Sequence, residues 1–309
     1  MAIYFKNGGQ SIARLWQSTS PGIQYSSEQR KYFIMCLILL AHGMIPDFPL
    51  VVAANRDEFF DRPSAAANFW PGSESSTLAG RDLQAGGSWI GVTRQGRFAG
   101  VTNIRSAEKK KQHLRSRGEL VRNFLNGTST PTQYCEAIQS HFPNFAGFNL
   151  LVGDGCSLCY ANNSQNIVRV LEPGIFGLSN VLLDRNWPKV NLGEKRLADL
   201  ISQENSISTD ALIDLMYDCE SANDDVLPDT GLPIELERIL SAIFIKHQQW
   251  NYGTRCSTAL VLTRRDGKVR FREQSYNELG QAADAQFFEF HSESGSTVVK
   301  HRDSLCRAV

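Results

Sequence analysis

Tight-turn signals between short apolar runs constrain the fold of this 309-residue chain more than any other feature. A glycine between two β-like runs favours an antiparallel hairpin, because such turns need backbone conformations that glycine adopts most easily. Three turns of this kind are centred on Gln95-Gly96, on Gly153-Asp154-Gly155 and on Asp266-Gly267. They predict hairpins from the paired runs 88–92 and 97–102, 148–152 and 157–160, and 257–263 and 268–272, with another strand at 286–290.

Helical patterns alternate with these hairpins. Ser116 and Glu119 form a capping-box pattern before an apolar stripe, Asn126-Gly127 ends that helix, and Pro131 suits the first turn of the next. Three further amphipathic patterns cover 194–201, 210–216 and 234–244. Hairpins separated by helix pairs predict an α+β fold of antiparallel sheets with helices outside. Since no linker or repeat interrupts it, we expect one domain over residues 35–309.

Residues 1–34 differ from the rest of the chain in composition. They are rich in Ser, Gly and Gln and carry four basic side chains against a single acid, Glu28. They contain no apolar segment typical of a secretory signal, although a basic, Ser-rich and acid-poor segment also resembles a transit peptide. We expect an N-terminal extension that is disordered or absent from the mature protein. The protein is then expected in the cytoplasm, or in an organelle such as the mitochondrion if the source is eukaryotic.

Charge and apolar content exclude several classes of function. Formal net charge is zero, which argues against nucleic acid as the main partner because phosphate binding needs a basic excess. No apolar run reaches the roughly 18–20 residues of a transmembrane helix, so no integral membrane segment is expected. The basic run 105–117 is interpreted as a solvated loop, with an anion-contacting lip of a pocket as the alternative.

The cysteines and histidines give no convincing metal site. Seven irregularly spaced cysteines in a chain this long indicate reduced thiols. Cys156 and Cys159 form one isolated C-x-x-C, and zinc needs two further ligands at a suitable spacing. His42 and His247 are interpreted as packing or surface residues. We therefore expect no metal and no required cofactor.

Cys36 is the candidate nucleophile. It follows Met35 at the start of an apolar, strand-sized run, as if the folded domain began there. If processing left Cys36 as the first residue, its α-amine, with a pKa of ~7.7–8.0, would lie beside a thiol with a pKa of ~8.5. The amine could then accept the thiol proton without help from a histidine. The alternative is an ordinary buried thiol on the first strand.

Polar residues lie at the ends of several other strand-like runs. The run 50–54 ends in Asn55-Arg56-Asp57-Glu58, where extended backbone puts Asn55 and Asp57 on one face and Arg56 and Glu58 on the other. One face could hold an amine while the other closes an ion pair, or the four residues could form a solvated junction. Further runs end in the possible oxyanion donors Asn103 and Asn180, and Arg255 precedes a strand.

The chain resembles the NRDE family, also called the transport and Golgi organisation protein 2 family. The resemblance is carried by "MCLILLAH", "VVAANRDEFFDRP", "AGGSWIGVTRQGRFAGVTN", "SRGELV", "FGLSN" and "YGTRCSTALVL", and it runs from Met35 nearly to the end. Members start at the Met-Cys pair. The family is similar to N-terminal-nucleophile hydrolases of the bile-salt hydrolase and penicillin acylase type, which implies a four-layer αββα sandwich.

The resemblance also implies roles for single residues. It implies Cys36 as the nucleophile, Asn103 and Asn180 as oxyanion positions, and Arg255 as a contact to substrate or transition state. Those hydrolases carry Arg-Asn-x-Asp where this chain has Asn-Arg-Asp-Glu at 55–58. Which of the residues 56, 57 and 58 orients the amine is therefore left open.

Two functions follow as hypotheses. The first is a cysteine-dependent hydrolase or acyltransferase acting on an amide or thioester of a hydrophobic small molecule. The second is a carrier on the same fold that binds haem or an acyl lipid as cargo, since family members are implicated in haem movement and in lipid homeostasis. In both, an apolar pocket is expected to hold the ligand. Its predicted lining is Phe59, Phe60, Trp70 and Trp89.

Overall fold

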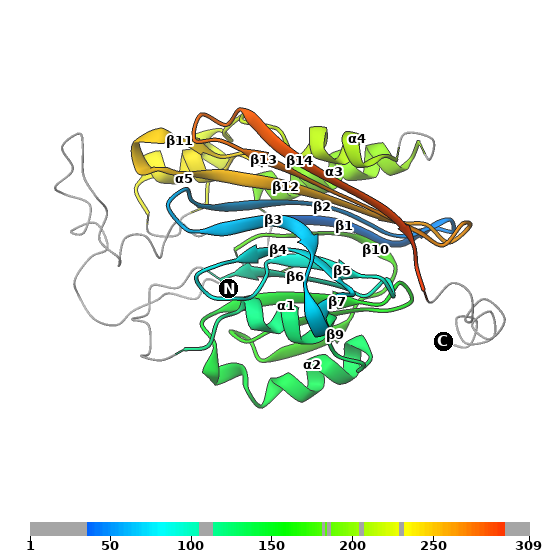
Figure 1. Cartoon of the computed structure of the whole chain (residues 1–309). Coiled ribbons are helices and arrows are strands. Elements are labelled where there is room, and N and C mark those ends of the chain that lie inside the picture. Colours follow the sequence, from blue (N-terminus) through cyan, green and yellow to red (C-terminus); the bar gives the residue numbers. More distant parts are fainter. Residues whose placement is uncertain are drawn as a thin grey trace.

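Two antiparallel sheets make up most of the protein. The computed structural model describes residues 36–104, 114–180, 183, 187–203, 207–228 and 232–293. Within them, each sheet contains seven strands and helices lie outside both sheets (Figure 1). This confirms the α+β class. The predicted extension 1–34 and residues 105–113 of the basic run lie outside the described residues.

The first sheet, sheet A, places its most apolar strands in the middle. Strand β2 pairs with β1 on one side and with β12 on the other, so that Ala54 lies opposite both Ile38 and Thr258. Such strands read as nearly continuous apolar runs because both of their faces are covered. In spatial order the strands are β10 (Gly174–Leu178), β1 (Cys36–Ile45), β2 (Phe48–Phe59), β12 (Tyr252–Leu262), β13 (Lys268–Tyr276) and β14 (Ala282–His291), with the short β11 (Lys246–His247) paired to β12.

The second sheet, sheet B, follows chain order from edge to edge. Most neighbouring strands are joined by hairpins or short connections, whereas residues 104–147, between the fourth and fifth strands, include two helices. All three predicted hairpins are present, two in sheet B and the third, around Gly267, in sheet A. Gly96, Gly155 and Gly267 have positive φ angles of 76°, 83° and 64° in their turns. The strands of sheet B are β3 (Ser64–Phe69), β4 (Thr77–Asp82), β5 (Ile90–Thr93), β6 (Phe98–Asn103), β7 (Phe148–Gly153), β8 (Leu158–Asn162) and β9 (Ile167–Val170).

Most helices begin and end close to the positions that the sequence indicates, but the third begins at Pro188, six residues before the expected start at 194. Thr130 and Gln133 form a full capping box at the second helix, whereas at the first helix Glu119 accepts a hydrogen bond from Ser116 N and the helix begins two residues later than Ser116. The fifth helix ends at Leu240, four residues before the expected end. The helices are α1 (Gly118–Leu125), α2 (Pro131–Gln139), α3 (Pro188–Ile201), α4 (Thr209–Leu215) and α5 (Ile234–Leu240), and the 3₁₀ turns are Gly72–Glu74, Phe142–Asn144, Asp224–Val226 and Gln248–Trp250.

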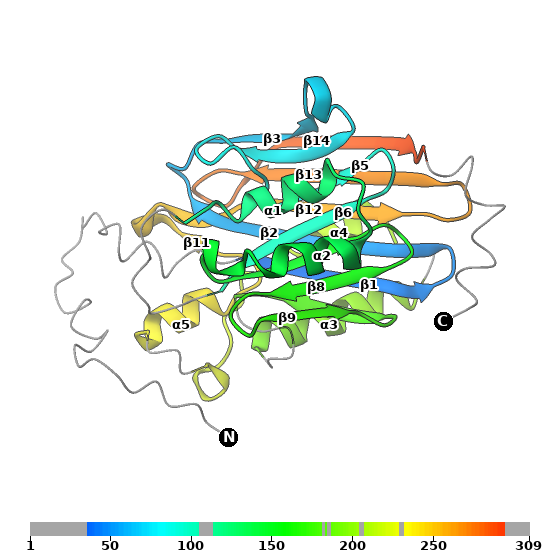
Figure 2. The ribbon, with the colours of Figure 1, turned by 90° about the horizontal axis from the view of Figure 1, so that it is seen from below.

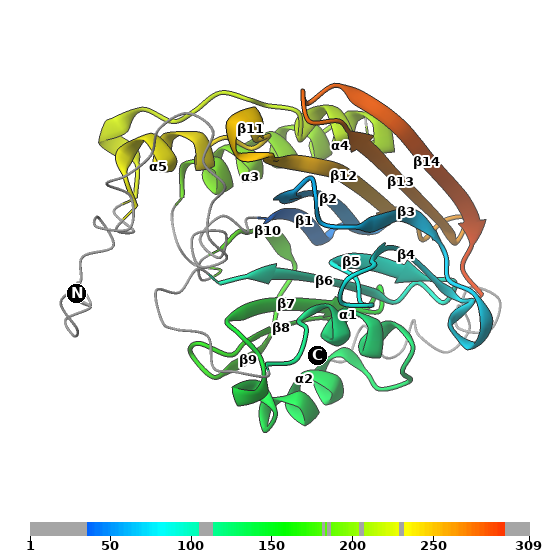
Figure 3. The ribbon, with the colours of Figure 1, turned by 60° about the vertical axis from the view of Figure 1, so that its left-hand side comes forward.

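Figure 3 shows the helices and the two sheets as successive layers, and three clusters of buried apolar side chains lie between them. Side chains alternate along a strand, so Leu37 packs with α3, α4 and α5 while its neighbour Ile38 faces sheet B. In sheet B, Leu151 faces sheet A, and Leu150 packs against α1 and α2, which cover that sheet in Figure 2. Fully burying a side chain of this size contributes about 1.5–3 kcal/mol, so the three cores supply most of the stabilisation.

Strand β2 corrects one sequence expectation. The apolar run was expected to end at Ala54, with a solvated junction at 55–58 as one alternative. Instead β2 continues to Phe59, and Asn55, Arg56, Asp57 and Glu58 are all buried. The polar side chains tolerate burial because both neighbouring strands pair with this part of β2 and because each side chain has a polar or charged neighbour.

Candidate functional site: a buried cysteine at the strand ends

Cys36 lies at the first position of β1, next to the polar end of β2. It is directly opposite Arg56, and Arg56 is in turn opposite Cys256 on β12. The three residues form a row across three strands on the face of sheet A that is directed toward sheet B. Cys36 is 8% exposed, so its side chain is buried.

The backbone nitrogen of Cys36 is held by Asn180. Cys36 N donates a hydrogen bond of 3.1 Å to Asn180 Oδ1, and Asn180 Nδ2 donates one of 2.8 Å to the carbonyl oxygen of Asn103. Strands β1 and β6 and the segment after β10 therefore meet at one carboxamide. The structure brings together Cys36, Asn103 and Asn180, which the sequence marks only as separate strand ends.

A buried network of hydrogen bonds around Asn149 holds the backbone next to Asn180, and the sequence analysis did not predict it. The carboxamide of Asn149 donates to Thr102 Oγ1 (3.1 Å) and to the carbonyl oxygen of Ser179 (3.2 Å), and it accepts from Tyr160 Oη (2.7 Å) and Asn162 Nδ2 (2.6 Å). Thr102 Oγ1 also donates to Ser179 O at 2.6 Å. Because buried amides without partners are costly, this network fixes the backbone just before Asn180.

The thiol of Cys36 is protonated at neutral pH in this state. Burial, and then the negative charge of Asp57, raise its pKa to about 12, while a hydrogen bond with the backbone of Asp57 and the charge of Arg56 act in the opposite direction. A thiol of this kind needs a base close by before it can act as a nucleophile.

Asn55 and Asp57 point to the helix-covered face of sheet A, as the alternation of the strand predicts. Asn55 Nδ2 donates to the carbonyl oxygens of Met216 (3.0 Å) and Ile243 (2.9 Å), and its Oδ1 accepts from Ser257 Oγ at 2.6 Å. All of these contacts tie β2 to β12 and to the segments that follow α4 and α5. The Asn55 side chain therefore supports the sheet.

Asp57 is a buried carboxylate with one strong partner. Its Oδ1 accepts a 2.6 Å hydrogen bond from Thr254 Oγ1, whereas its Oδ2 has no hydrogen-bond partner among the described residues. Burial raises the pKa of Asp57 to about 6, and the positive charge of Lys189, a buried residue at the start of α3, acts against this rise. The sequence singles out Asp57 but gives no sign of Lys189, which comes from a helix far along the chain.

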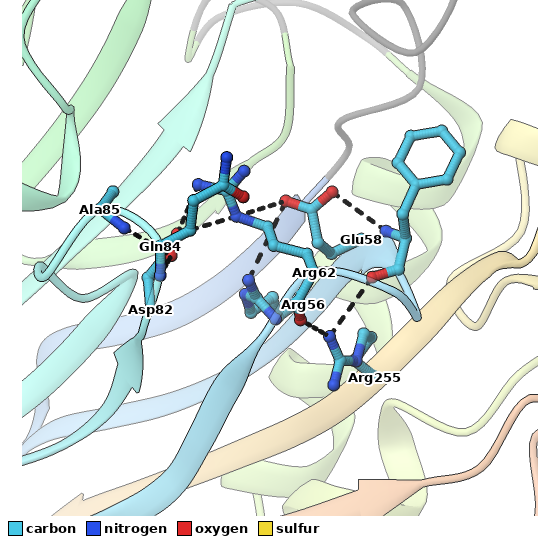
Figure 4. A network of polar contacts seen from close by, with 8 residues as sticks. Arg56, Glu58, Arg62, Asp82, Gln84, Ala85 and Arg255 are labelled. Atoms are coloured by element: carbon cyan, nitrogen blue, oxygen red, sulfur yellow. Dashed lines mark hydrogen bonds and ion pairs between the residues drawn. The ribbon is translucent and has the colours of Figure 1, made fainter. Parts of the chain in front are cut away.

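Arg56 and Glu58 share the face that carries Cys36. Arg56 Nη2 lies 3.9 Å from Glu58 Oε2, which confirms the predicted ion pair, and the guanidinium lies 4.3 Å from the centre of the Trp89 ring. Glu58 also accepts from the backbone N–H of Phe59 (3.0 Å) and lies 3.6 Å from Arg62 Nε (Figure 4). Glu58 therefore orients two arginines at the edge of the site.

Arg255 holds the turn that leaves β2. It lies at an irregularity in the pairing of β12 with β2, and its guanidinium donates to the carbonyl oxygens of Phe59 (3.3 Å) and Arg62 (Figure 4). Arg62 itself makes a 2.7 Å ion pair with Asp82 on β4. Arg255 thus holds the backbone at the end of β2 while the Arg62 side chain reaches sheet B, and the predicted contact of Arg255 to a substrate remains a prediction.

The four aromatic residues predicted to line one pocket lie in different surroundings. Phe59 is buried on the helix side of sheet A, where its ring packs edge-on to Tyr252 at 5.1 Å. Trp70 is buried and donates to the carbonyl oxygen of Ala79 at 3.0 Å. Phe60 and Trp89 are partly exposed near the site, Phe60 with the Arg255 guanidinium 5.6 Å from its ring. Of the four, Trp89 contacts Arg56, the cross-strand neighbour of Cys36.

Three further residues match or extend the sequence reading. Arg117, the described end of the basic run, is close enough for the charges of Cys36 and Glu58 to act on it, while burial lowers its pKa to about 10. Cys156 is exposed in a turn whereas Cys159 is buried, so this pair does not face one site. In the part of the chain that the structure describes, no group of three potential metal ligands occurs.

The fold and the site define a class: an α+β protein with two antiparallel sheets and a buried cysteine among polar strand ends. The family model described as "Transport and Golgi organisation 2" matches residues 35–278, and the chain belongs to this family. The cattle (Bos taurus) protein named "Transport and Golgi organization protein 2 homolog" is 32% identical over 259 residues, covering 78% of this chain and 93% of that protein. The fruit-fly (Drosophila melanogaster) protein is 22% identical over 266 residues, covering 79% and 93%.

A likeness to a solved structure is weaker. The Caenorhabditis elegans N-acylethanolamine-hydrolyzing acid amidase ortholog matches with a TM-score of 0.40 and 11% identity, covering 73% of this chain and 92% of that chain. This likeness assigns no activity. None of the helices in the described ranges is both long enough and apolar enough to cross a membrane.

Proposed function

We propose that this protein is a cysteine-dependent acyl hydrolase or acyltransferase of the N-terminal-nucleophile type, acting on an amide or thioester of a hydrophobic small molecule. The observation that carries the proposal is the hydrogen bond from Cys36 N to Asn180 Oδ1 beside the thiol. If the peptide bond before Cys36 is cut, this nitrogen becomes an α-amine that is already held next to the sulfur. The four-layer αββα arrangement belongs to the same proposal and is supported by the three apolar cores.

In the proposed reaction the amine of Cys36 accepts the thiol proton and the sulfur attacks the acyl carbonyl. The carboxamide of Asn180, which accepts a hydrogen bond from Cys36 N, is the proposed donor to the tetrahedral oxyanion, with its hydrogen bond to the carbonyl oxygen of Asn103 fixing its orientation. The amine then returns the proton to the leaving amine or thiol. Water, or an acceptor amine, releases the acyl group from Cys36. Arg56 stabilises negative charge on the sulfur during the attack.

The test compares two proteins, the full chain and a chain that begins at Cys36. Each is mixed with the octanoyl thioester of N-acetylcysteamine, and acyl adducts are measured by intact mass and peptide mapping. We expect an adduct on Cys36 that forms faster in the shortened chain, is absent in Cys36→Ala and is retained in Cys219→Ala, which removes an exposed thiol. Asn180→Ala should slow acylation by about 100- to 1,000-fold. Equal rates in the two chains would contradict the role of the free amine.

A second function is favoured by one observation on the uncut chain. With the preceding peptide bond intact, the pKa of the Cys36 thiol is about 12 and no α-amine is present. In this form the site can bind a ligand without reacting, as a carrier of haem or an acyl lipid would. Titration of the full chain with haem then gives a shifted Soret band that Cys36→Ser retains. No shift at micromolar haem would rule out the haem carrier.

A further inference from the structure

Glu273 is a buried carboxyl that the proposed reaction does not use. It lies on β13 at the same parity as the core residues Val269 and Phe271, so its side chain points between the two sheets. Its exposed fraction is 1%. A carboxyl in such a position is costly unless it has partners, so its contacts indicate what it does.

The contacts of Glu273 come from sheet B. Oε1 accepts a 2.7 Å hydrogen bond from the backbone N–H of Ala67 on β3, whereas Oε2 accepts none from the described residues. Gly80 on β4 leaves the space for this arrangement. A Cβ at position 80 would lie 2.3 Å from the ring of Trp89 and 3.2 Å from Glu273 Oε2. The carboxyl and the Trp89 ring therefore meet at one glycine.

The same tryptophan contacts Arg56. The guanidinium lies 4.3 Å from the centre of the Trp89 ring and 3.9 Å from Glu58 Oε2, and the charge of Arg56 also acts on Glu273. Arg56 is thus attracted by a carboxylate at the edge of the site and by a second one between the sheets. Arg56 is the cross-strand neighbour of Cys36. A change in the balance of these two attractions therefore changes how close the positive charge of Arg56 lies to the thiol.

The groups around Glu273 let its charge change near neutral pH. Burial raises its pKa to about 7, against the effects of the Ala67 N–H, the Cys256 thiol and the Arg56 charge. Of these, Cys256 and Arg56 are the ionisable neighbours, from β12 and β2. The residues that face it from β3, β4 and β14 are Ala67, Gly80 and Gln286, which carry no charge.

We propose that Glu273 is a positioning residue for Arg56: its buried carboxyl, when ionised, draws the guanidinium along the Trp89 ring and away from the Cys36 thiol. The inference rests on the proposed function for its meaning, since it concerns the reactivity of Cys36. In the neutral form of Glu273, Arg56 is left to Glu58 and lies closest to the sulfur. The Cys36 thiol is therefore more reactive when Glu273 is neutral, below its titration midpoint, than when Glu273 is ionised.

Two measurements on the full chain test the inference. The first follows the indole N–H signal of Trp89 by NMR, identified by its loss in Trp89→Phe, as pH is raised. We expect a midpoint near pH 7 in wild type, and none in Glu273→Gln. The second measures alkylation of Cys36 by iodoacetamide, relative to the exposed Cys156. Below the midpoint, wild type and Glu273→Gln should react equally. Above it, Glu273→Gln should react faster by on the order of tenfold, because the variant lacks the negative charge that draws Arg56 away from the thiol.

The matched control is Glu289→Gln, which removes an exposed carboxyl from β14 and should leave both profiles unchanged. Superimposable profiles for wild type and Glu273→Gln would overturn the inference. If Glu273→Gln does not fold, the wild-type protein alone provides the test. A Trp89 indole midpoint at the same pH as a change in the ratio of the Cys36 and Cys156 alkylation rates supports the inference, and the absence of this coincidence overturns it. Alkylation needs no acyl chemistry, so failure of octanoyl transfer to Cys36 sinks the proposed function and leaves this test intact.

Discussion

Asn55→Ala is expected to destabilise the fold while leaving Cys36 chemistry in place. The side chain is 2% exposed and makes three hydrogen bonds, to the carbonyl oxygens of Met216 and Ile243 and from Ser257 Oγ. Each such bond contributes a net ~1 kcal/mol, so removing all three lowers the free energy of unfolding by about 3 kcal/mol. In a domain of this size that corresponds to a melting temperature roughly 6–12 °C lower.

The assay is urea unfolding followed by tryptophan fluorescence, with the slope checked so that only the midpoint changes. Ser257→Ala is the matched variant, because it removes one of the three bonds and should cost about 1 kcal/mol. Asn68→Ala changes an exposed asparagine and should stay within about 0.5 kcal/mol of wild type. Alkylation of Cys36 by iodoacetamide is measured on the same proteins in the absence of urea.

Two results would refute this reasoning. A loss below about 1 kcal/mol for Asn55→Ala would show that the three bonds are not the main contribution of the side chain. A large loss of Cys36 alkylation in a protein that unfolds at the wild-type urea concentration would place Asn55 at the reacting centre. Asn55 would then take part in the reaction, although its side chain points to the opposite face of β2 from Cys36.

Three further outcomes are expected. Burial raises the pKa of Asp57 from 3.8 to about 6, so between these pH values the folded state keeps a proton that the unfolded state releases. The free energy of unfolding therefore falls by about 3 kcal/mol as pH rises through this range. The urea midpoint of Asp57→Asn should fall less over the same range. Gly80→Ala places a methyl group against the Trp89 ring and should lower stability by about 1–3 kcal/mol in urea unfolding, with a changed Trp89 indole signal. Phe98→Ala leaves a cavity between the sheets and should lower the free energy of unfolding by about 3–5 kcal/mol, measured in urea.

The hairpins could be predicted because their signals are local. Gly155 and Gly267 adopt positive φ angles within turns of a few residues, and the apolar runs beside them need no knowledge of the rest of the chain. The helix positions follow from the same kind of pattern, and so does the opposite orientation of Asn55 and Arg56. The end of β2 was misjudged because four polar residues in sequence are typical of a loop, and only pairing with β1 and β12 keeps them in a strand.

The rest of the site could not be read from the sequence, because it depends on contacts between distant segments. Asn149 and Ser179 meet across 30 residues, and Cys36 and Asn180 across 144. No local rule specifies that an asparagine within an apolar strand will support another strand end. Glu273 lies just beyond the run 268–272 that the sequence predicts as a strand, so neither its burial nor its neighbours Trp89 and Arg56 could be predicted from the local pattern.

Side chains alternate between the two faces of β2, which explains why the Asn-Arg-Asp-Glu sequence has both a structural and a reactive role. On the helix side, Asn55 and Asp57 bind backbone carbonyls and hydroxyl groups of segments that must stay in place. On the side facing sheet B, Arg56 and Glu58 form the charged edge of the Cys36 site. A one-residue shift in the pairing of β2 would exchange the two faces, burying the ion pair under the helices and placing an amide beside the thiol. The same register therefore governs both stability and reactivity, and substitutions on the two faces should separate them.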